Sequence, residues 1–299
     1  MLMISVGVGT SIGVNSLLSR RLGERRKADA EAVAGNGLFL AVVIWLAFAI
    51  LGFAISKPFM RLFTGDEAIA PLGTTYVRIC TIASLGIFGQ VIAERIMQAT
   101  GDTIRPMLTQ LAGALINIIL DPLLIFGLAG FPKLGVAGAA IATVIGQWSA
   151  MMLALLLLRR ERTHIEVSLR LIRPNPTLIK EIYQVGLPSI IMQSIGSIMT
   201  VGMNKILIAF SATAVSVFGV YFKLQSFIFM PVFGITMATI PIIGFNFGAR
   251  NPHRIAQTVK TAAIMAILIM LAGLAVFQLF PGFLLHLFDA SPEIGRAHV

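Results

Sequence analysis

Long apolar runs, separated by short polar segments, follow one another along almost the whole chain. A helix needs about 20 mostly apolar residues to cross a hydrocarbon core of about 30 Å, so each run predicts one membrane-spanning helix. Barrel strands would instead alternate apolar and polar residues over about ten positions. The pattern predicts an all-α, polytopic membrane protein with eight spans, at Met1–Ser19, Val33–Ser56, Gly73–Ala99, Pro106–Gly127, Leu134–Leu158, Ile182–Phe210, Thr213–Phe245 and Val259–Leu287.

Composition supports a membrane environment. Of the 299 residues, 57% are hydrophobic and only 12% are charged, and the mean hydropathy is +0.90, which leaves too little polar surface for a soluble globule. The net charge of +10 does not indicate nucleic-acid binding, because most Lys and Arg residues fall in a few short loops. The single cysteine, Cys80, lies in an apolar run and is interpreted as a buried, inert thiol.

The loop charges predict which side each loop faces, since Lys and Arg accumulate in cytoplasmic loops. The loops after the second and fourth runs carry few cations, and the loop after the sixth run carries none near Ser211. These loops are therefore expected to face outward. The basic loops, expected in the cytoplasm, follow the first, third, fifth and seventh runs and hold Arg20, Arg21, Arg25, Arg26, Lys27, Arg105, Arg159, Arg160, Arg162, Arg170, Arg173, Arg250, Arg254 and Lys260.

An internal repeat with an offset of 225 residues relates the two ends of the chain. Its ungapped matches pair Gly9 with Gly234, Gly23 with Gly248, Arg25 with Arg250, and Leu62-Phe63 with Leu287-Phe288. The repeat skips an even number of helices, so both copies cross the membrane in the same direction. It therefore predicts two six-helix lobes, related by a pseudo-twofold axis along the membrane normal.

The same offset predicts the domain organisation. Residues 1–158 are expected to form the N-terminal lobe without its first helix, 159–180 a cytoplasmic linker, and 181–292 part of the C-terminal lobe. One helix before Met1 and about three after Val299 would complete a set of twelve. Residues 293–299, EIGRAHV, resemble the translation of a sequencing adapter and are left out of the fold prediction.

Several segments resemble the MATE (multidrug and toxic compound extrusion) family, in the branch of bacterial multidrug export proteins. They include NSLLSRRLGERRKADAEA from Asn15, NIILDPLLIFG from Asn117 and GVAGAAIATVIGQ from Gly135; others are QATGDTIRP from Gln98, VGLPSIIMQ from Val185 and YFKLQSFIFMPVFG from Tyr221. The resemblance reaches Pro292 and covers helices two to nine of the family's twelve. It implies alternating access in a monomer of the bacterial inner membrane, without a cofactor, and export of cationic or amphipathic drugs and dyes in exchange for Na⁺ or H⁺.

Asp121 is the leading candidate for chemistry, because an ionisable group inside a span is costly and usually functional. Asn117 lies one helical turn earlier on the same face, Pro122 can bend the helix or free a carbonyl, and Thr143 on the next helix offers a hydroxyl. By resemblance, Asn117, Asp121 and Thr143 form the coupling-ion site of the first lobe. The alternative is a hydrogen-bonded pair that only holds helices together. A proton would serve at a desolvated Asp as well as Na⁺.

Other intramembrane polar residues are candidates for the cavity or a gate. Glu94 and Arg95 lie near the cytoplasmic end of the third run and, being adjacent, are expected to project to different sides of the helix, in a structural or gate-lining role rather than in substrate contact. Gln90 could line the cavity or bond between helices. Lys223 could line the cavity. Because it would repel cationic drugs, a role in helix packing or gating is at least as well supported. Phe227 and Met230 belong to an aromatic and methionine-rich patch that could line a drug pocket or simply face lipid. The remaining candidates are Gln193, Asn204 and Tyr221.

The sequence argues against an enzyme. It shows no paired acids, no His at metal-ligand spacing, no nucleophile beside a base, and no phosphate-binding glycine loop. The closest alternative is a lipid-linked saccharide flippase of the same superfamily, which shares the architecture. Such a flippase would be expected to line its cavity with cations for a pyrophosphate, whereas the first lobe here offers Asp121.

Overall fold

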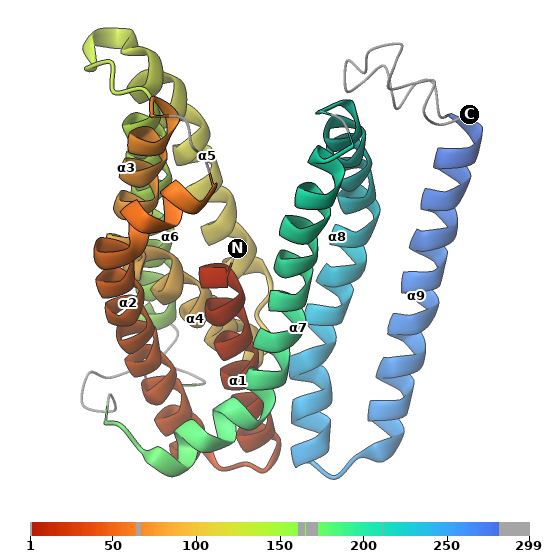
Figure 1. Ribbon diagram of the computed structural model, residues 1–299. Coiled ribbons are helices and arrows are strands. Elements are labelled where there is room, and N and C mark those ends of the chain that lie inside the picture. Colours follow the sequence, from red (N-terminus) through yellow and green to blue (C-terminus); the bar gives the residue numbers. More distant parts are fainter. Residues whose placement is uncertain (1, 64–66, 161–164, 166–172, 211, 281–299) are drawn as a thin grey trace.

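The computed structural model describes residues 2–63, 67–160, 165, 173–210 and 212–280, and within these residues the regular structure is helical, with no strand (Figure 1). This confirms the all-α prediction. One short 3₁₀ turn, Leu128–Gly130, follows α5. The helices are α1 (Leu2–Gly23), α2 (Lys27–Phe63), α3 (Ile69–Ile82), α4 (Leu85–Ala99), α5 (Ile104–Phe126), α6 (Val136–Arg160), α7 (Pro176–Ile208), α8 (Ala212–Gly248) and α9 (Pro252–Leu279).

Seven of these helices are long and apolar enough to cross a membrane, and the number is eight if the bent pair of α3 and α4 counts as one span. Counted in this way, the spans agree in number with the eight predicted. The third differs from the prediction, because Gly73–Ala99 is not one helix: α3 and α4 meet at an angle of 44°. Ser84 and Gly86 lie at this bend, where a Ser and Gly pair commonly breaks a helix. Residues 281–287 of the last predicted span, and the adapter-like 293–299, lie outside the described residues.

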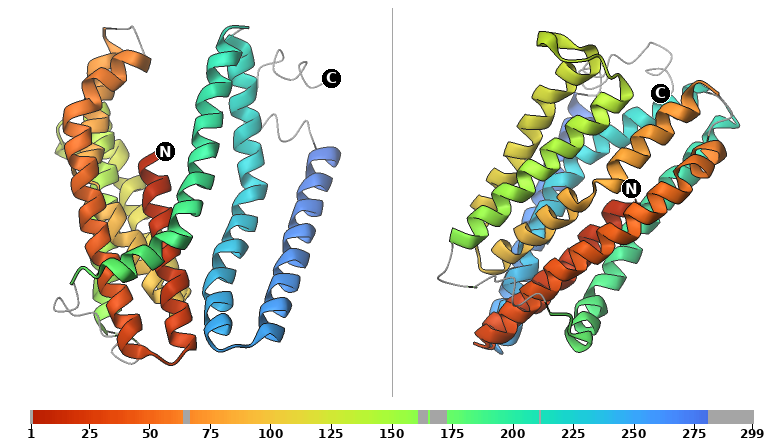
Figure 2. Two further views of the ribbon diagram at one scale, coloured as in Figure 1. Left: turned by 60° about the horizontal axis from the view of Figure 1, so that its bottom comes forward. Right: turned by 90° about the vertical axis from the view of Figure 1, so that its left-hand side faces the viewer.

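The helices form two groups, α1–α6 and α7–α9, with α7 running beside α1 (Figures 1 and 2). The buried core lies mainly on α1, α2 and α4 of the first group, and Ile182 of α7 packs into it. Its largest members include Leu18, Phe88, Ile92 and Ile96, each at most 2% exposed. Most apolar side chains of α7–α9 are exposed instead. Such apolar outer faces suit lipid, as expected of a multi-pass membrane protein.

The two groups approach each other at what we call the basic end, where the α1–α2 and α8–α9 turns carry Arg20, Arg21, Arg25, Arg26, Lys27, Arg250 and Arg254 (Figure 1). Glycine makes this approach possible. A Cβ added at Gly23 would overlap the carbonyl oxygen of Phe245, and a Cβ at Gly248 would overlap that of Arg20. The backbones of α1 and α8 therefore touch directly.

These two contacts are equivalent under the 225-residue offset, since Gly23 corresponds to Gly248 and Arg20 to Phe245. The turns that follow α1 and α8 also match. Arg25 and Arg250 both have positive φ, at 60° and 54°, and each N–H bonds the carbonyl three residues earlier, at 3.0 and 3.1 Å. A reciprocal contact is what a pseudo-twofold axis between the two copies requires. The structure thus bears out the repeat read from the sequence.

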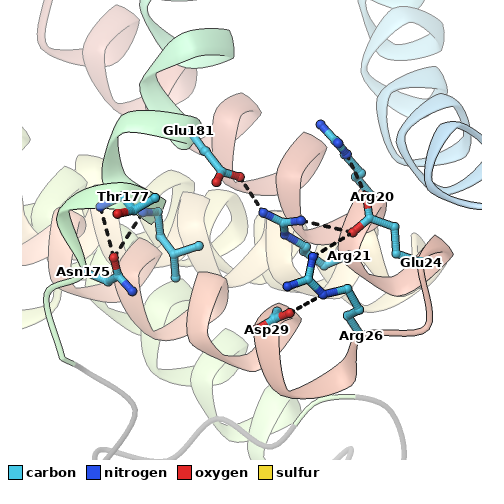
Figure 3. Close-up of polar contacts among 9 residues, drawn as sticks. Arg20, Arg21, Glu24, Arg26, Asp29, Asn175, Thr177 and Glu181 are labelled. Carbon is cyan, nitrogen blue, oxygen red and sulfur yellow. Dashed lines mark hydrogen bonds and ion pairs between the residues drawn. The ribbon is translucent and has the colours of Figure 1, made fainter.

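Ion pairs add a second link at the basic end (Figure 3). Arg21 donates to Glu24 at 3.0 Å and to Glu181 of α7 at 2.6 Å, so it connects the α1–α2 turn to the second group. Burial by itself would raise the pKa of Glu24. Hydrogen bonds from Arg20 and Arg21, together with their positive charges, outweigh this and hold the pKa of Glu24 below its ordinary value.

Candidate functional site

The candidate site begins where α5 crosses α6. A Cβ at Gly113 would lie 3.0 Å from the carbonyl oxygen of Gly146, so the two backbones are nearly in contact. Small residues allow such close crossings in membrane helices. One turn after Gly113, the Cβ of Asn117 lies only 3.2 Å from the position of a Cβ on Gly146. The crossing therefore places Asn117 against α6.

Asn117 and Asp121 meet as the spacing predicts: the Asn117 amide Nδ2 donates to Asp121 Oδ1 at 3.3 Å. On α6, the Thr143 hydroxyl donates to the carbonyl of Ala139 at 2.9 Å, which leaves its oxygen lone pairs free to accept or to bind a cation. Tyr76, on α3, lies near Cys80 of its own helix and near Thr143 and Asp121. Three helices thus contribute oxygens to one region.

An open pocket of about 190 Å³ lies between α4, α5 and α6 beside this region. Asn117 and Thr143 form one part of its wall, and Gln90 and Gln110 form another. All four side chains are polar, so the pocket has room and partners for several water molecules. The remaining lining residues are Gly113, Ala114, Gly146 and Gln147.

Glu94 lies behind the pocket wall and is only 4% exposed. Gln90 and Thr109 donate to its Oε1 at 2.9 and 2.8 Å, and Gln110 donates to Oε2 at 3.5 Å. The adjacent Arg95 points elsewhere, donating to Gln98 at 2.6 Å. The expectation that Glu94 and Arg95 project to different sides of the helix is therefore met. Glu94 is a hydrogen-bonded, buried carboxyl group that two pocket-lining glutamines hold in place.

The other predicted cavity residues lie away from this region. Gln193 of α7 is half-buried, and its Nε2 is a buried donor without a partner among the described residues. Asn204 of α7 is exposed. The α8 candidates are exposed as well and do not converge with Asp121; these are Tyr221, Lys223, Phe227 and Met230.

The sequence reading missed Tyr76, Thr109 and Gln110. Tyr76 comes from a helix two spans before Thr143, and no spacing rule along the chain connects them. Gln110 and Thr109 both lie about two turns before Asn117 on α5, so the face of α5 that carries Asn117 was a usable signal for them.

The cluster around Asp121 has one carboxylate and several neutral oxygens. Within the described residues, no group of three or more His, Cys, Asp or Glu side chains gathers as a metal site would require. A single negative charge with amide and hydroxyl oxygens fits a monovalent cation or a proton better than a multivalent metal.

Comparisons with known proteins point to one family. A family model described as MatE matches residues 1–123 and 188–297. A protein of Thermotoga maritima named as a probable multidrug resistance protein, NorM, is 27% identical over 289 residues, which cover 96% of this chain and 62% of that protein. A Shewanella oneidensis protein named as an FAD transporter is 27% identical over 305 residues, or 98% of this chain and 65% of that one.

Among solved structures, an outward-facing multidrug resistance MATE transporter of the MOP superfamily superposes with a TM-score of 0.88 at 29% identity, covering 96% of this chain and 63% of that one. The chain thus spans a little under two thirds of the length of these relatives. The helical architecture, the reciprocal repeat and a family model that matches most of its residues show that this chain belongs to the MATE family.

Proposed function

We propose that the protein is a secondary active multidrug exporter of the bacterial inner membrane, which exchanges cationic or amphipathic compounds for Na⁺ or H⁺. The basic end then faces the cytoplasm, in line with the loop charges. The observation that carries the proposal is the convergence of Asp121, Asn117, Thr143 and Tyr76 from three helices beside a polar pocket. The multidrug names of several relatives support the substrate class.

The coupling ion acts through the oxygens of this cluster. Na⁺ would be held by the Asp121 carboxylate, the Asn117 carbonyl oxygen and the Thr143 hydroxyl; a proton would neutralise Asp121 directly. Either event removes the negative charge from the interior of the first lobe, next to Pro122, a proline inside α5 that cannot donate a backbone hydrogen bond. An ion shifts the balance between outward-facing and inward-facing states only if it binds them with different affinity. The proposal therefore assigns that difference in affinity to Asp121.

The test is export of ethidium from cells or inverted vesicles that carry the intact transporter, with pH and Na⁺ gradients imposed separately. Dye export should collapse when one of the two gradients is removed, which identifies the ion. Asp121→Asn should reduce gradient-driven export at least tenfold, because the amide neither titrates nor carries a negative charge, while membrane expression stays at the wild-type level.

Asp102→Asn is the matched control. Asp102 caps the start of α5, accepting from the Ile104 and Arg105 N–H groups at 3.1 Å, and an Asn side chain caps equally well. Export should be unchanged in this variant. Unaltered, ion-driven export in Asp121→Asn would remove Asp121 from the coupling site. No export of any dye by a well-expressed wild type would favour the lipid-linked saccharide flippase instead.

A further inference from the structure

The bend between α3 and α4 is held by two side chains from other helices. The indole Nε1–H of Trp45, on α2, donates to the carbonyl of Ile82 at 2.7 Å, and that of Trp148, on α6, donates to the carbonyl of Ala83 at 2.9 Å. These are the only two tryptophans in the sequence. The two indoles therefore bond consecutive carbonyls at the same bend, one from α2 and one from α6.

The bend creates the need for these donors. In a continuous helix the N–H of Gly86 would bond the carbonyl of Ile82, but here it points to Ala83 at a long 3.5 Å. The Ser84 hydroxyl donates to Thr81 at 2.7 Å and so does not serve these carbonyls. A carbonyl or an indole N–H without a partner is unfavourable at the lipid-facing surface of a span, because no water is there to replace the missing bond. The two indoles meet both needs together.

The Trp148 contact also fixes how α3 lies along α6. A Cβ on Gly86 would come within 2.7 Å of Trp148 Cδ1, so the start of α4 is packed tightly on this ring. Seven residues before Ala83 on α3 is Tyr76, and five residues before Trp148 on α6 is Thr143. The two helices run in the same direction, and Tyr76 lies near Thr143. Trp148 thus sets the register in which Tyr76 reaches the Asp121 cluster.

We propose that Trp148, assisted by Trp45, is a positioning residue for the coupling-ion site: the two indoles hold the α3–α4 bend, and the bend holds the Tyr76 hydroxyl against Thr143 and Asp121. This inference rests on the proposed role of Asp121. Trp148 itself does not touch the ion. Its loss should therefore weaken ion coupling without removing the carboxylate that binds the ion.

The first experiment measures the ion concentration, or the pH, at which ethidium export by the intact transporter is half-maximal. Trp148→Phe keeps a ring against Gly86 but removes the N–H donor. It should shift the half-maximal value at least threefold toward higher Na⁺ or H⁺ and leave export at saturating ion near the wild-type rate. Phe48→Leu is the control, because Phe48 lies one turn from Trp45 and packs on Phe88, with 5.8 Å between ring centroids, without bonding the bend. Its half-maximal value should not move.

A double-mutant cycle separates positioning from general packing. If Trp148 acts through Tyr76, then adding Trp148→Phe to Tyr76→Phe should cause no further shift in the half-maximal value. Equal shifts in both backgrounds, or no shift from Trp148→Phe alone, would overturn the proposal.

A second measurement does not depend on transport. In a Cys80→Ala background, the pair Tyr76→Cys and Thr143→Cys should react with a short bifunctional thiol reagent, and adding Trp148→Phe should slow that crosslinking at least threefold. An unchanged crosslinking rate in the presence of Trp148→Phe would contradict the positioning role, even if the variants do not export. Conversely, if crosslinking of the cysteine pair slows with Trp148→Phe as expected while the wild type exports no dye under either gradient, the proposed function is contradicted and the role of the bend stands.

Discussion

The glycines of α7 and α8 have different surroundings at the two ends of these helices. Near the basic end, Gly244 and Gly248 of α8 lie against α1, and Gly186 of α7 lies 3.1 Å, measured from a built Cβ, from the carbonyl oxygen of Gly9. Toward the opposite end, none of the described residues comes within 4 Å of such a Cβ on Gly196 or Gly202 of α7, nor on Gly219 or Gly234 of α8. The same residue type marks a helix contact at one end and open space at the other.

This difference describes how the two groups of described helices meet. The two groups are in backbone contact at the basic end and lie apart at the other end, as the ribbons of Figures 1 and 2 also show. With the basic end in the cytoplasm, as proposed, this is the outward-facing arrangement. Alternating access would require the contacts at the basic end to open, and the open glycines of α7 and α8 are then free to meet partners of their own.

The largest effect is expected from adding one methyl group to the closed end. Gly23→Ala places a Cβ on the carbonyl oxygen of Phe245, and a backbone atom cannot rotate away. We expect this overlap to lower the free energy of unfolding by about 1 to 3 kcal/mol, and to reduce dye export more than tenfold by disfavouring the closed basic end. Thermal unfolding in detergent and ethidium export measure the two effects.

Gly202→Ala is the matched control, because the same substitution there meets open space. It should leave unfolding and export within error of wild type, or raise stability slightly, since Ala favours a helix more than Gly. Equal effects at both positions would show that the contrast between the two ends does not describe the protein in its membrane.

The sequence predicted this interface only in part. The offset of 225 residues correctly paired Gly23 with Gly248, because a reciprocal contact about a pseudo-twofold axis places the same demand on both copies. It also paired Gly9 with Gly234, yet Gly9 packs on Ile190 of α7 while Gly234 is open. Only one of these two copies has a neighbour in this conformation, and no sequence pattern reports which state the helices adopt.

The candidate site shows the same limit. Helical spacing was enough to predict that Asn117 and Asp121 meet, because both lie on α5 one turn apart. Tyr76 and Trp148 could not be found that way, since their roles depend on the bend at Ser84 and on the register of α3 against α6. The run from Gly73 to Ala99 is apolar on both sides of the bend, and hydropathy carries no information on the direction of a helix axis, so the sequence did not predict the bend.

A smaller effect should follow from removing the ion pair that crosses the closed end. Glu181→Gln breaks the pair with Arg21 but leaves the contacts of Arg21 with Glu24 in place. Because the pair is partly exposed, we expect a loss of about 1 kcal/mol, or about a fivefold shift away from the closed state. The probe is Ser19→Cys in a Cys80→Ala background, since Ser19 is fully buried beside Gly244 and is uncovered only on opening.

Thiol labelling of this cysteine should be about fivefold faster in Glu181→Gln. The control is Glu31→Gln, which changes the same side chain in a pair with Lys27 that stays within α2, and its labelling rate should not change. Equal rates in wild type and Glu181→Gln would mean that the glycine contacts alone hold the basic end closed.

The smallest effect is expected from acid, through Glu24. Its pKa in the folded protein lies below the ordinary value of 4.5, so its ion pairs with Arg20, Arg21 and Arg26 contribute stability that is fully present above pH 4.5 and is lost as the pH falls through the folded pKa. Between pH 6 and pH 3.5 the unfolding midpoint of wild type should therefore drop by about 1 to 2 °C more than that of Glu24→Gln, which has no proton to take up there. The opposite sign, a larger acid loss in Glu24→Gln, would mean that Glu24 is not held ionised by its arginines, and the closed end would then depend on shape and on the Arg21 to Glu181 pair alone.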